Sequence, residues 1–297
     1  MLVMSAPIVF LLDVLPADAM ADEATLEASI TSGGDGSGVL SVFDLGPARG
    51  DGIFETIGVV GRHAQSVDAH LARLTESAAI LDLPAPNHAQ WRTAVDRAVA
   101  ALPDAEQSAV RLVLTRGSGE RPTAWVSATP ASGFPERADG IEVVLLDRGL
   151  SSDVQERSPW LLAGAKTLSY AVNMAALREA HRRGADDVLF VSSDGFVLEG
   201  PTSTVVARIG GTFVTPPASS GILPGTTQLA LWEHLEAEGH PCEHRMLTPD
   251  DVMQADAVWL LSSVRLAAPV AAVDGRPVGI DRGLTAELNA ALLARTE

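Results

Sequence analysis

The sequence is poor in several residue types, and each shortage limits what the protein can be. Cysteine occurs once, at position 242, which excludes an internal disulfide bond and fits a reducing compartment. Aromatic residues make up 4% of the chain against 46% hydrophobic residues in all, so we expect a core of Ala, Val, Leu and Ile, as in α/β proteins. Lysine also occurs once, as Lys166, and no other lysine can take its place in amine chemistry.

Positive charge is scarce as well. Lys and Arg number 21 against 38 Asp and Glu, which gives a formal net charge of −17. Nucleic acid and anionic membranes repel such a chain, so we expect neither as a partner. A small anionic substrate remains compatible, because it needs only a local cluster of arginines. No apolar run reaches the roughly 20 residues that a membrane helix needs, and we expect a soluble, cytoplasmic protein.

A chain of 297 residues exceeds the usual size of one hydrophobic core, which predicts two domains. We expect a small α+β domain over residues 1–150 and a larger α/β domain over residues 160–297. The polar segment 151–159 lacks hydrophobic periodicity and is the expected interdomain linker. The glycine-rich interval Thr31–Gly38 predicts a mobile loop, to which the sequence assigns no role.

The first domain has the pattern of helices packed on one sheet. Gly52–Val60 has the apolar stretches of a strand, and Asp68 is placed to cap a helix with apolar residues at helical spacing. Arg73 lies off the apolar stripe of that helix. The other expected elements are a helix over His88–Leu102 and strands over Ala109–Thr115, Thr123–Ala128 and Ile141–Leu146.

Lys166 lies in an apolar run of small residues, Leu162–Tyr170, ahead of a helix predicted over Val172–Arg183. Small neighbours let another group approach the amine, and apolar surroundings disfavour the ammonium form, so more of the amine can act as a nucleophile. This is the chemistry of a Schiff base. The alternative interpretation is a surface lysine whose stem lies along apolar neighbours.

Three further features accompany this lysine. A strand expected over Phe196–Glu199 presents Glu199, whose carboxylate could hold a ring nitrogen protonated and make that ring an electron sink. The loop Gly221–Thr227 opens a helix and offers backbone N–H groups and threonine hydroxyls to a phosphate. Arg73 would add a charged fork. Taken one at a time, Glu199 could be an exposed strand end, the loop a simple helix cap and Arg73 a solvated helix residue. Taken together with the lysine, they favour a site for an aldehyde cofactor with a ring nitrogen and a phosphate.

From Arg49 onward the chain resembles the fold type IV pyridoxal-phosphate enzymes, which include branched-chain aminotransferases, D-amino-acid transaminases and aminodeoxychorismate lyases. The resemblance implies a D-amino-acid-aminotransferase-like architecture. In it, a small α+β domain and a larger α/β domain with a barrel-like sheet hold pyridoxal 5'-phosphate between them, and the protein is a homodimer. The segments that carry the resemblance are Gly50–Thr56, His70–Leu74, Lys166–Tyr170, Asp194–Gly200 and Gly221–Thr227.

The resemblance also implies a role for particular residues. Lys166 would form the Schiff base and Glu199 would contact the pyridine nitrogen. The phosphate would be held by three residues, Arg73, Thr226 and Thr227.

The chain departs from the family pattern at three places. Pro201–Thr204 stands where a Ser or Thr followed by an asparagine is usual. Thr226 and Gln228 replace an aliphatic and a basic residue. These departures leave the imine chemistry intact and bear on the fine geometry and the substrate.

The reaction favoured by the resemblance is that of bacterial aminodeoxychorismate lyase, which converts 4-amino-4-deoxychorismate to 4-aminobenzoate and pyruvate in the folate pathway. The alternative is an aminotransferase for D-amino acids or branched-chain amino acids. Similar D-amino-acid transaminases trap a carboxylate with an arginine and a histidine two positions later; here Arg121 matches the arginine, whereas Thr123 replaces the histidine. Arg121 is therefore a candidate substrate-binding residue. A third interpretation is a protein that binds the cofactor and catalyses nothing.

Overall fold

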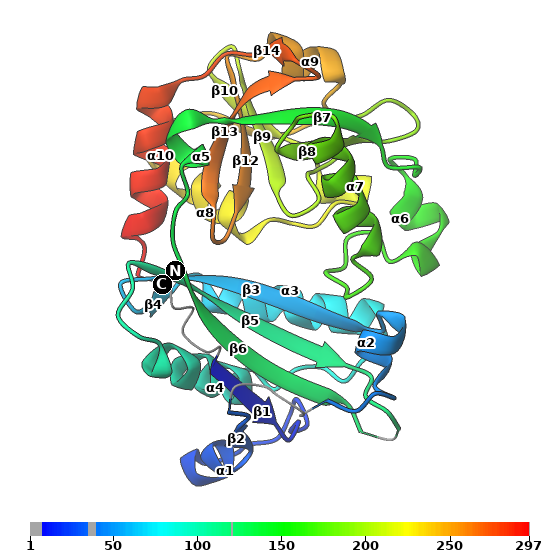
Figure 1. The fold of residues 1–297 in the computed structure, drawn as a ribbon, viewed down its shortest axis with the longest axis vertical. Helices are drawn as coiled ribbons and strands as arrows, with labels where there is room; N and C mark the ends of the chain where they lie inside the picture. Colours follow the sequence, from blue (N-terminus) through cyan, green and yellow to red (C-terminus); the bar gives the residue numbers. More distant parts are fainter. Residues whose placement is uncertain (1–7, 35–39, 120, 297) are drawn as a thin grey trace. The chain divides into compact units, whose positions relative to one another are not determined.

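The computed structural model describes residues 8–34, 40–119 and 121–296, which form two compact units (Figure 1). The first unit comprises residues 1–133, 165–169 and 296–297, and the second comprises residues 134–164 and 170–295. Part of the glycine-rich interval predicted as a mobile loop, residues 35–38, lies outside the described residues. Its first two residues, Thr31 and Ser32, belong to strand β2 (Ile30–Ser32).

The first unit is built on a six-stranded antiparallel sheet with the strand order β2-β1-β6-β5-β3-β4. Strand β3 (Gly52–Val60), next to the edge strand β4, pairs with β5 (Gln107–Thr115) over its whole length. The remaining strands are β1 (Ile8–Leu12), β4 (His63–Ala64) and β6 (Thr123–Ala131), and the helices are α1 (Glu23–Ala28), α2 (Leu45–Arg49), α3 (Val67–Ile80) and α4 (His88–Ala101).

Helices α3 and α4 pack on this sheet through apolar side chains at the predicted helical spacing. Leu71 and Leu74 of α3 and Trp91 and Val95 of α4 are fully buried. The α+β pattern expected for the first part of the chain is therefore confirmed. The prediction that Asp68 caps α3 is wrong, because the cap position is taken by Ser66 in a left-handed conformation and Asp68 lies within the first turn.

The second unit contains an eight-stranded mixed sheet in which β11-β10-β9-β12-β13-β7-β8 are neighbours and β14 pairs with β13. Strand β7 runs parallel to both β8 and β13, whereas β9, β12 and β13 pair antiparallel. This mixed pattern agrees with the α/β class expected for the later part of the chain. The strands are β7 (Ile141–Asp147), β8 (Asp187–Val191), β9 (Thr204–Ile209), β10 (Thr212–Thr215), β11 (Cys242–His244), β12 (Ala257–Ser262), β13 (Leu266–Val273) and β14 (Arg276–Pro277).

Helices and short helical turns complete the second unit. Helix α9 begins with the capping box expected from the sequence, because Thr248 and Asp251 exchange side-chain-to-backbone hydrogen bonds. The helical segments are α5 (Glu136–Asp139), α6 (Val154–Arg157), η1 (Pro159–Leu161), α7 (Ala171–Arg182), η2 (Ala218–Ser220), α8 (Thr226–Ala237), α9 (Pro249–Gln254) and α10 (Arg282–Ala294). Within the described part of the chain, no helix has both the length and the apolar character needed to cross a membrane.

The two units divide at places other than the predicted domain limits. Strand β7 was expected within residues 1–150, but its hydrogen bonds to β8 and β13 place it in the second unit. Segment 151–159, expected as a linker, contains helix α6 with the buried Val154 and also belongs to the second unit. Conversely, residues 165–169 belong to the first unit. Local polarity suggested the limits, whereas strand pairing between distant segments determines them.

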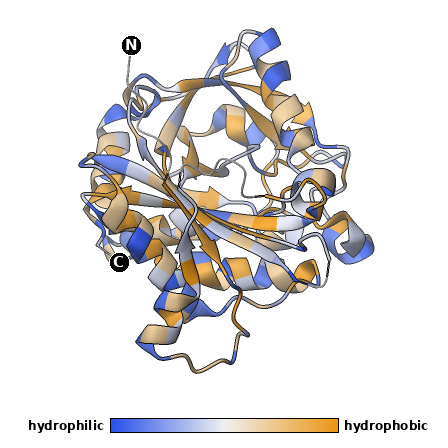
Figure 2. Ribbon diagram, turned by 60° about the horizontal axis from the view of Figure 1, so that its bottom comes forward, coloured by the Kyte–Doolittle hydropathy of each residue, from blue (hydrophilic) through white to orange (hydrophobic). Residues whose placement is uncertain are grey.

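The core of each unit is mainly aliphatic, as the composition predicts. Figure 2 shows that many strand residues are hydrophobic, whereas helices carry both hydrophobic and hydrophilic residues. Trp91 in the first unit, and Trp259 and Phe213 in the second, are the aromatic side chains among the largest fully buried ones. These three aromatic side chains thus lie in the centres of otherwise aliphatic cores.

Candidate active site

The segment that carries Lys166 is held by the main chain of β3 in the first unit. Phe54 N donates to Lys166 O at 3.0 Å, and Leu168 N donates to Gly52 O at 2.8 Å. Between these bonds Ile53 and Thr167 form an antiparallel bridge. A Cβ at Gly52 would lie 2.8 Å from both Leu114 O and the Leu168 side chain, so a larger residue would push the lysine segment away from the sheet. The lysine backbone is therefore fixed on a sheet rather than carried by a free surface loop.

The Lys166 amine lies beside an aromatic ring that also contacts a second cation. Lys166 Nζ is 4.6 Å from the centroid of the Phe54 ring, and Arg111 Cζ is 4.3 Å from the same centroid. The two cationic groups therefore lie within about 9 Å of each other. Arg111 is not among the site residues predicted from the sequence, although a charged residue within the apolar run of β5 could have indicated it. This arrangement is suited to attracting a small anion.

Arg73 forms a buried ion pair with Glu55, the residue that follows Phe54 on β3. Its Nε and Nη2 donate to Glu55 Oε1 and Oε2 at 2.8 and 2.7 Å, and His70 Nδ1 lies 2.7 Å from Glu55 Oε2. The exposed fractions are 0% for Glu55, 2% for His70 and 7% for Arg73. The solvated helix residue considered as an alternative for Arg73 is thus excluded. Glu55 and His70 are not among the site residues predicted from the sequence, because no local sequence pattern links either of them to Arg73.

Burial and ion pairing have opposing effects on the pKa values of Glu55 and His70. Burial alone would raise the pKa of Glu55, but the charge of Arg73 and hydrogen bonds from Arg73 and His70 outweigh it and hold the pKa well below its ordinary value. Burial lowers the pKa of His70 despite its hydrogen bond to Glu55, and the charges of Arg73 and Lys166 act in the same direction. The cluster therefore consists of an ionised Glu55, a charged Arg73 and a neutral His70 at neutral pH.

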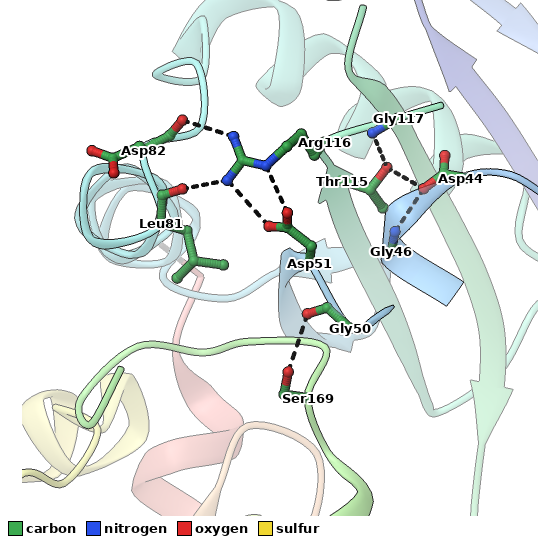
Figure 3. Close-up of polar contacts among 10 residues, drawn as sticks. All are labelled: Asp44, Gly46, Gly50, Asp51, Leu81, Asp82, Thr115, Arg116, Gly117 and Ser169. Carbon is green, nitrogen blue, oxygen red and sulfur yellow. Dashed lines mark hydrogen bonds and ion pairs between the residues drawn. The ribbon is translucent and has the colours of Figure 1, made fainter. Parts of the chain in front are cut away.

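A second hydrogen-bond network is centred on Arg116 and joins the turn before β3 to the end of α3 (Figure 3). Arg116 contacts both carboxylate oxygens of Asp51, at 2.6 and 3.1 Å, and donates to the carbonyls of Leu81 and Asp82 at the end of α3. The hydrogen bond to Asp51, more than the opposing effect of burial, raises the pKa of Arg116. Arg116 thus ties the end of α3 to the turn that precedes β3.

The same turn contacts the residues that follow the lysine. Ser169 Oγ donates to Gly50 O at 3.3 Å, as Figure 3 shows. Gly50 ends α2 in a left-handed conformation, and a Cβ there would lie 2.6 Å from Ser169 Oγ. On the other side, the Lys166 backbone N–H donates to Ser77 Oγ of α3 at 3.1 Å. The lysine segment is therefore held by the turn, the strand and the helix of one unit.

Glu199 lies in the second unit, where its carboxylate faces the loop that opens α8. Glu199 Oε2 accepts from Leu223 N at 3.2 Å, and Glu199 O accepts from Phe190 N at 2.9 Å. The strand predicted over Phe196–Glu199 is wrong, since that segment forms only isolated bridges through Val197. Burial lowers the pKa of Arg148, and the negative charge of Glu199 opposes this shift. Arg148 is thus a cation close to Glu199 that the sequence did not reveal.

The segment that departs from the family pattern, Pro201–Thr204, is held at its first carbonyl. Tyr170 Oη and Asn173 Nδ2 both donate to Pro201 O, at 2.7 and 2.6 Å. At the other end, Thr204 approaches the start of α8 so closely that a Cβ at Gly225 would lie 2.2 Å from Thr204 Oγ1. The threonine therefore fits only because residue 225 is glycine.

Thr226 and Thr227 form the first turn of α8, and both are buried. Gly225 is the N-cap residue of this helix, and among the described residues no side chain makes a capping hydrogen bond there. Thr226 Oγ1 lies 3.5 Å from Ser263 Oγ, a residue that the sequence did not single out. Helix N–H groups without a capping side chain, together with clustered hydroxyls, are donors suited to a phosphate. This end of α8 therefore fits the phosphate of the cofactor that the sequence resemblance implies.

The predicted residues fall into two groups, one in each unit. Lys166 and Arg73 lie near each other in the first unit, since both act on His70. Arg121 is also in the first unit, but it is exposed in the tight loop after Gly117. Glu199, Thr226 and Thr227 belong to the second unit. In the described ranges, no group of three or more His, Cys, Asp or Glu residues is arranged to hold a metal ion.

Known proteins resemble this chain in sequence and in structure. Residues 52–273 match the sequence profile of the class IV amino-transferases. A bifunctional aminodeoxychorismate lyase / D-amino acid transaminase of Mycobacterium tuberculosis is 48% identical over 254 residues, which cover 81% of this chain and 88% of that protein.

Two solved structures have the same fold. A fold IV transaminase from Curtobacterium pusillum is 47% identical and covers 98% of this chain and 100% of its own, with a TM-score of 0.91. The pyridoxal-phosphate-bound form of a hypothetical aminotransferase from Mycobacterium tuberculosis is 42% identical and covers 97% and 99% of the two chains, with a TM-score of 0.86. These likenesses confirm the expected fold type IV architecture. The chain therefore belongs to the class IV aminotransferase family, whose members are pyridoxal-phosphate-dependent enzymes.

Proposed function

We propose that this protein is a pyridoxal-phosphate-dependent aminodeoxychorismate lyase that converts 4-amino-4-deoxychorismate to 4-aminobenzoate and pyruvate. The observation that supports it most is the 48% identity to a protein named for that activity, over 81% of this chain. In the overall conversion, pyruvate leaves the ring and the ring becomes aromatic, so no external oxidant or reductant is required. We also propose that the protein acts in the cytoplasm as a homodimer.

Each predicted residue has a place in this proposal. Pyridoxal phosphate, when bound, supplies an aldehyde that links to amines and a ring that withdraws electrons from an amine-bearing carbon. Lys166 is the lysine available for that link, and its amine accepts the proton that leaves the amine-bearing carbon of the substrate. That carbon carries no hydrogen in 4-aminobenzoate, so the proton goes to the departing pyruvate. The Glu199 carboxylate holds the ring nitrogen protonated. The phosphate is held by hydroxyls, helix N–H groups and a guanidinium from Thr226, Thr227 and Arg73.

The charges around Lys166 support an anionic substrate. Aminodeoxychorismate carries carboxylates, and the exposed residue Arg111 contacts the same Phe54 ring as the lysine amine. We propose that Arg111 attracts a substrate carboxylate toward Lys166. Arg121, the residue singled out from the sequence, is exposed in the loop after Gly117 and is the second candidate for such a contact.

The second candidate function is amino transfer with D-amino acids. It is favoured by the name of the same relative, which combines lyase and D-amino acid transaminase activities. Thr123, standing where similar transaminases carry a histidine, weakens this alternative. Branched-chain amino transfer is the activity named for a more distant relative, a putative branched-chain-amino-acid aminotransferase 28% identical over 249 residues, and is supported less by it. A protein that binds the cofactor and catalyses nothing is disfavoured, because Lys166 and Glu199 are both retained.

A side-by-side assay tests the proposal. The purified protein, reconstituted with pyridoxal phosphate, is given 4-amino-4-deoxychorismate in one series and D-alanine with 2-oxoglutarate in the other. We expect 4-aminobenzoate and pyruvate in equal amounts in the first series, at a higher kcat/KM than that of amino transfer. Amino transfer without any 4-aminobenzoate would replace the lyase by the second candidate. Sedimentation of the holoenzyme at twice the chain mass is the expected result for the homodimer.

A further inference from the structure

The loop that brings Ser263 to the start of α8 has a backbone conformation that its own sequence does not favour. The strands β12 and β13 pair up to Ser262 and Leu266, which leaves a loop of three residues. Leu266, the first residue of β13 after this loop, has a φ of 60°, in the left-handed region that glycine adopts readily and a leucine rarely does. Since Leu266 is also fully buried, contacts from outside the loop must hold this conformation.

Arg137, a residue of the short helix α5, supplies such contacts. Its Nη2 donates to Val264 O and its Nε to Arg265 O, both at 2.7 Å. The guanidinium also stacks on Phe134, with Cζ 4.3 Å from the ring centroid. A planar guanidinium can donate two bonds side by side to adjacent carbonyls, which a lysine ammonium cannot do with the same geometry. Arg137 therefore fixes the peptide groups that contain the Val264 and Arg265 carbonyls, on the C-terminal side of Ser263.

The flanks of the loop are fastened by other groups. The Arg265 side chain pairs with the buried Asp187 at 2.9 Å. The Asn289 carboxamide of α10 bonds both the N–H and the carbonyl of Ala267, at 3.0 and 2.8 Å. These contacts hold a side chain and the following strand. The contacts of Arg137, by contrast, reach two carbonyls of the loop itself.

We propose that Arg137 is a positioning residue for phosphate binding. By donating hydrogen bonds to the carbonyls of Val264 and Arg265, it keeps Ser263 Oγ beside Thr226 Oγ1 at the N-terminus of α8. Arg137 acts through Ser263 and does not itself contact the phosphate. This inference rests on the proposed function, in which the cofactor phosphate binds at that helix end.

The test compares two ligands of the apoenzyme that differ only in the phosphate. Dissociation constants are measured for pyridoxal 5'-phosphate and for pyridoxal, with wild type, Arg137→Met and Ser263→Ala. Arg137→Met removes the two hydrogen bonds to the loop carbonyls. This loss should weaken pyridoxal phosphate binding about tenfold, the size expected for a charge-assisted hydrogen bond. Pyridoxal binding should stay within about twofold, because pyridoxal does not use the phosphate donors.

Further variants separate positioning from a general loss of stability. If Arg137 acts through Ser263, the double variant Arg137→Met/Ser263→Ala should bind pyridoxal phosphate no more weakly than the weaker single variant. Arg208→Met is the matched control, since it removes an arginine that pairs with Asp281 elsewhere in the second unit, and it should not change the ratio of the two constants. Should Arg137→Met fail to fold, Arg137→Lys keeps the charge and loses the fork, and a loss of about threefold is expected.

The possible failures are distinguishable. If wild type binds pyridoxal as tightly as pyridoxal phosphate, the phosphate site of the proposed function is wrong. If wild type prefers the phosphorylated ligand and Arg137→Met retains the full preference, only the role of Arg137 is overturned. Equal weakening of both ligands, or additive losses in the double variant, also overturns it, because these results indicate a structural role or an independent one.

Discussion

Arg73 and Glu55 are joined by two parallel hydrogen bonds, of 2.8 and 2.7 Å, in the interior of the first unit. The carboxylate is fully buried, so its desolvation cost is offset by this guanidinium and by His70. Arg73 is thus a structural partner of β3 whatever else it binds. A substitution at Arg73 consequently affects both stability and any ligand.

Arg73→Met should lower the free energy of unfolding by about 3–5 kcal/mol, because it leaves the Glu55 charge buried without its main partner. Urea unfolding of the apoprotein measures this loss. The matched variant Glu55→Gln/Arg73→Met should recover part of it, since the stranded charge is gone. A loss below about 1 kcal/mol for the single variant would show that water or another group compensates the carboxylate.

Lys166→Ala should abolish the covalent adduct that borohydride reduction of the holoenzyme leaves on the chain. The chain has no second lysine to substitute for it. Intact mass and peptide mapping after reduction provide the measurement, and wild type should carry one adduct in the peptide that contains residue 166. An adduct of normal yield elsewhere in Lys166→Ala would contradict the assignment.

Glu199→Gln should slow turnover by orders of magnitude while the cofactor remains bound. A neutral amide does not stabilise a protonated pyridine nitrogen, so the ring withdraws electrons less effectively. Absorbance of the purified variant reports bound cofactor and kcat reports chemistry. Turnover within about threefold of wild type would mean that another group stabilises the protonated ring nitrogen or that its protonation is not needed.

Arg111→Gln should raise KM for the anionic substrate with little change in cofactor affinity. The guanidinium lies over the Phe54 ring that Lys166 also contacts, and removing a carboxylate contact of the proposed kind costs about 1.5–3 kcal/mol, or roughly tenfold to a hundredfold. Steady-state kinetics with saturating pyridoxal phosphate give the value. Arg121→Gln serves as the comparison, and a larger effect there would transfer the substrate contact to Arg121.

Stability should fall as the pH decreases from 7 to 5, in part because of His70. Burial lowers the pKa of His70 below its ordinary value of 6.5, so as the pH falls the unfolded chain takes up this proton before the folded chain does. His70→Asn keeps an N–H donor for Glu55 but cannot titrate, and its unfolding free energy should change less, by up to about 1.4 kcal/mol per pH unit. Urea unfolding at pH 7, 6 and 5 measures both slopes.

Glu55 contributes to the same trend at lower pH. Its pKa lies well below the ordinary 4.5, so its contribution to stability is present above that value and is lost as the pH falls toward the lowered pKa. The charged groups around His70 are Glu55, Arg73 and Lys166. If wild type and His70→Asn had the same slope between pH 7 and 5, folding would leave the pKa of His70 unshifted, and a wild type that gained stability relative to the variant as the pH fell would mean that His70 is charged in the folded protein.

The sequence by itself determined the chemistry available to this protein. A single lysine, one glutamate after a glycine-containing turn and two threonines at a helix start are facts of composition and order. Periodicity located α3, α4 and the strands around them, because side chains repeat every 3.6 residues in a helix and every two in a strand. The resemblance to a family then followed from motifs that are contiguous in the chain.

Only the tertiary structure decided which groups meet. Lys166 belongs to the first unit because its segment bonds to β3, more than a hundred residues earlier in the chain. Glu55, Arg111 and Ser263 became visible as partners of Arg73, Phe54 and Thr226 for the same reason. Hydrogen bonds and ion pairs between distant segments leave no periodic signal in either segment, so neither their existence nor the unit limits they set can be obtained from local sequence.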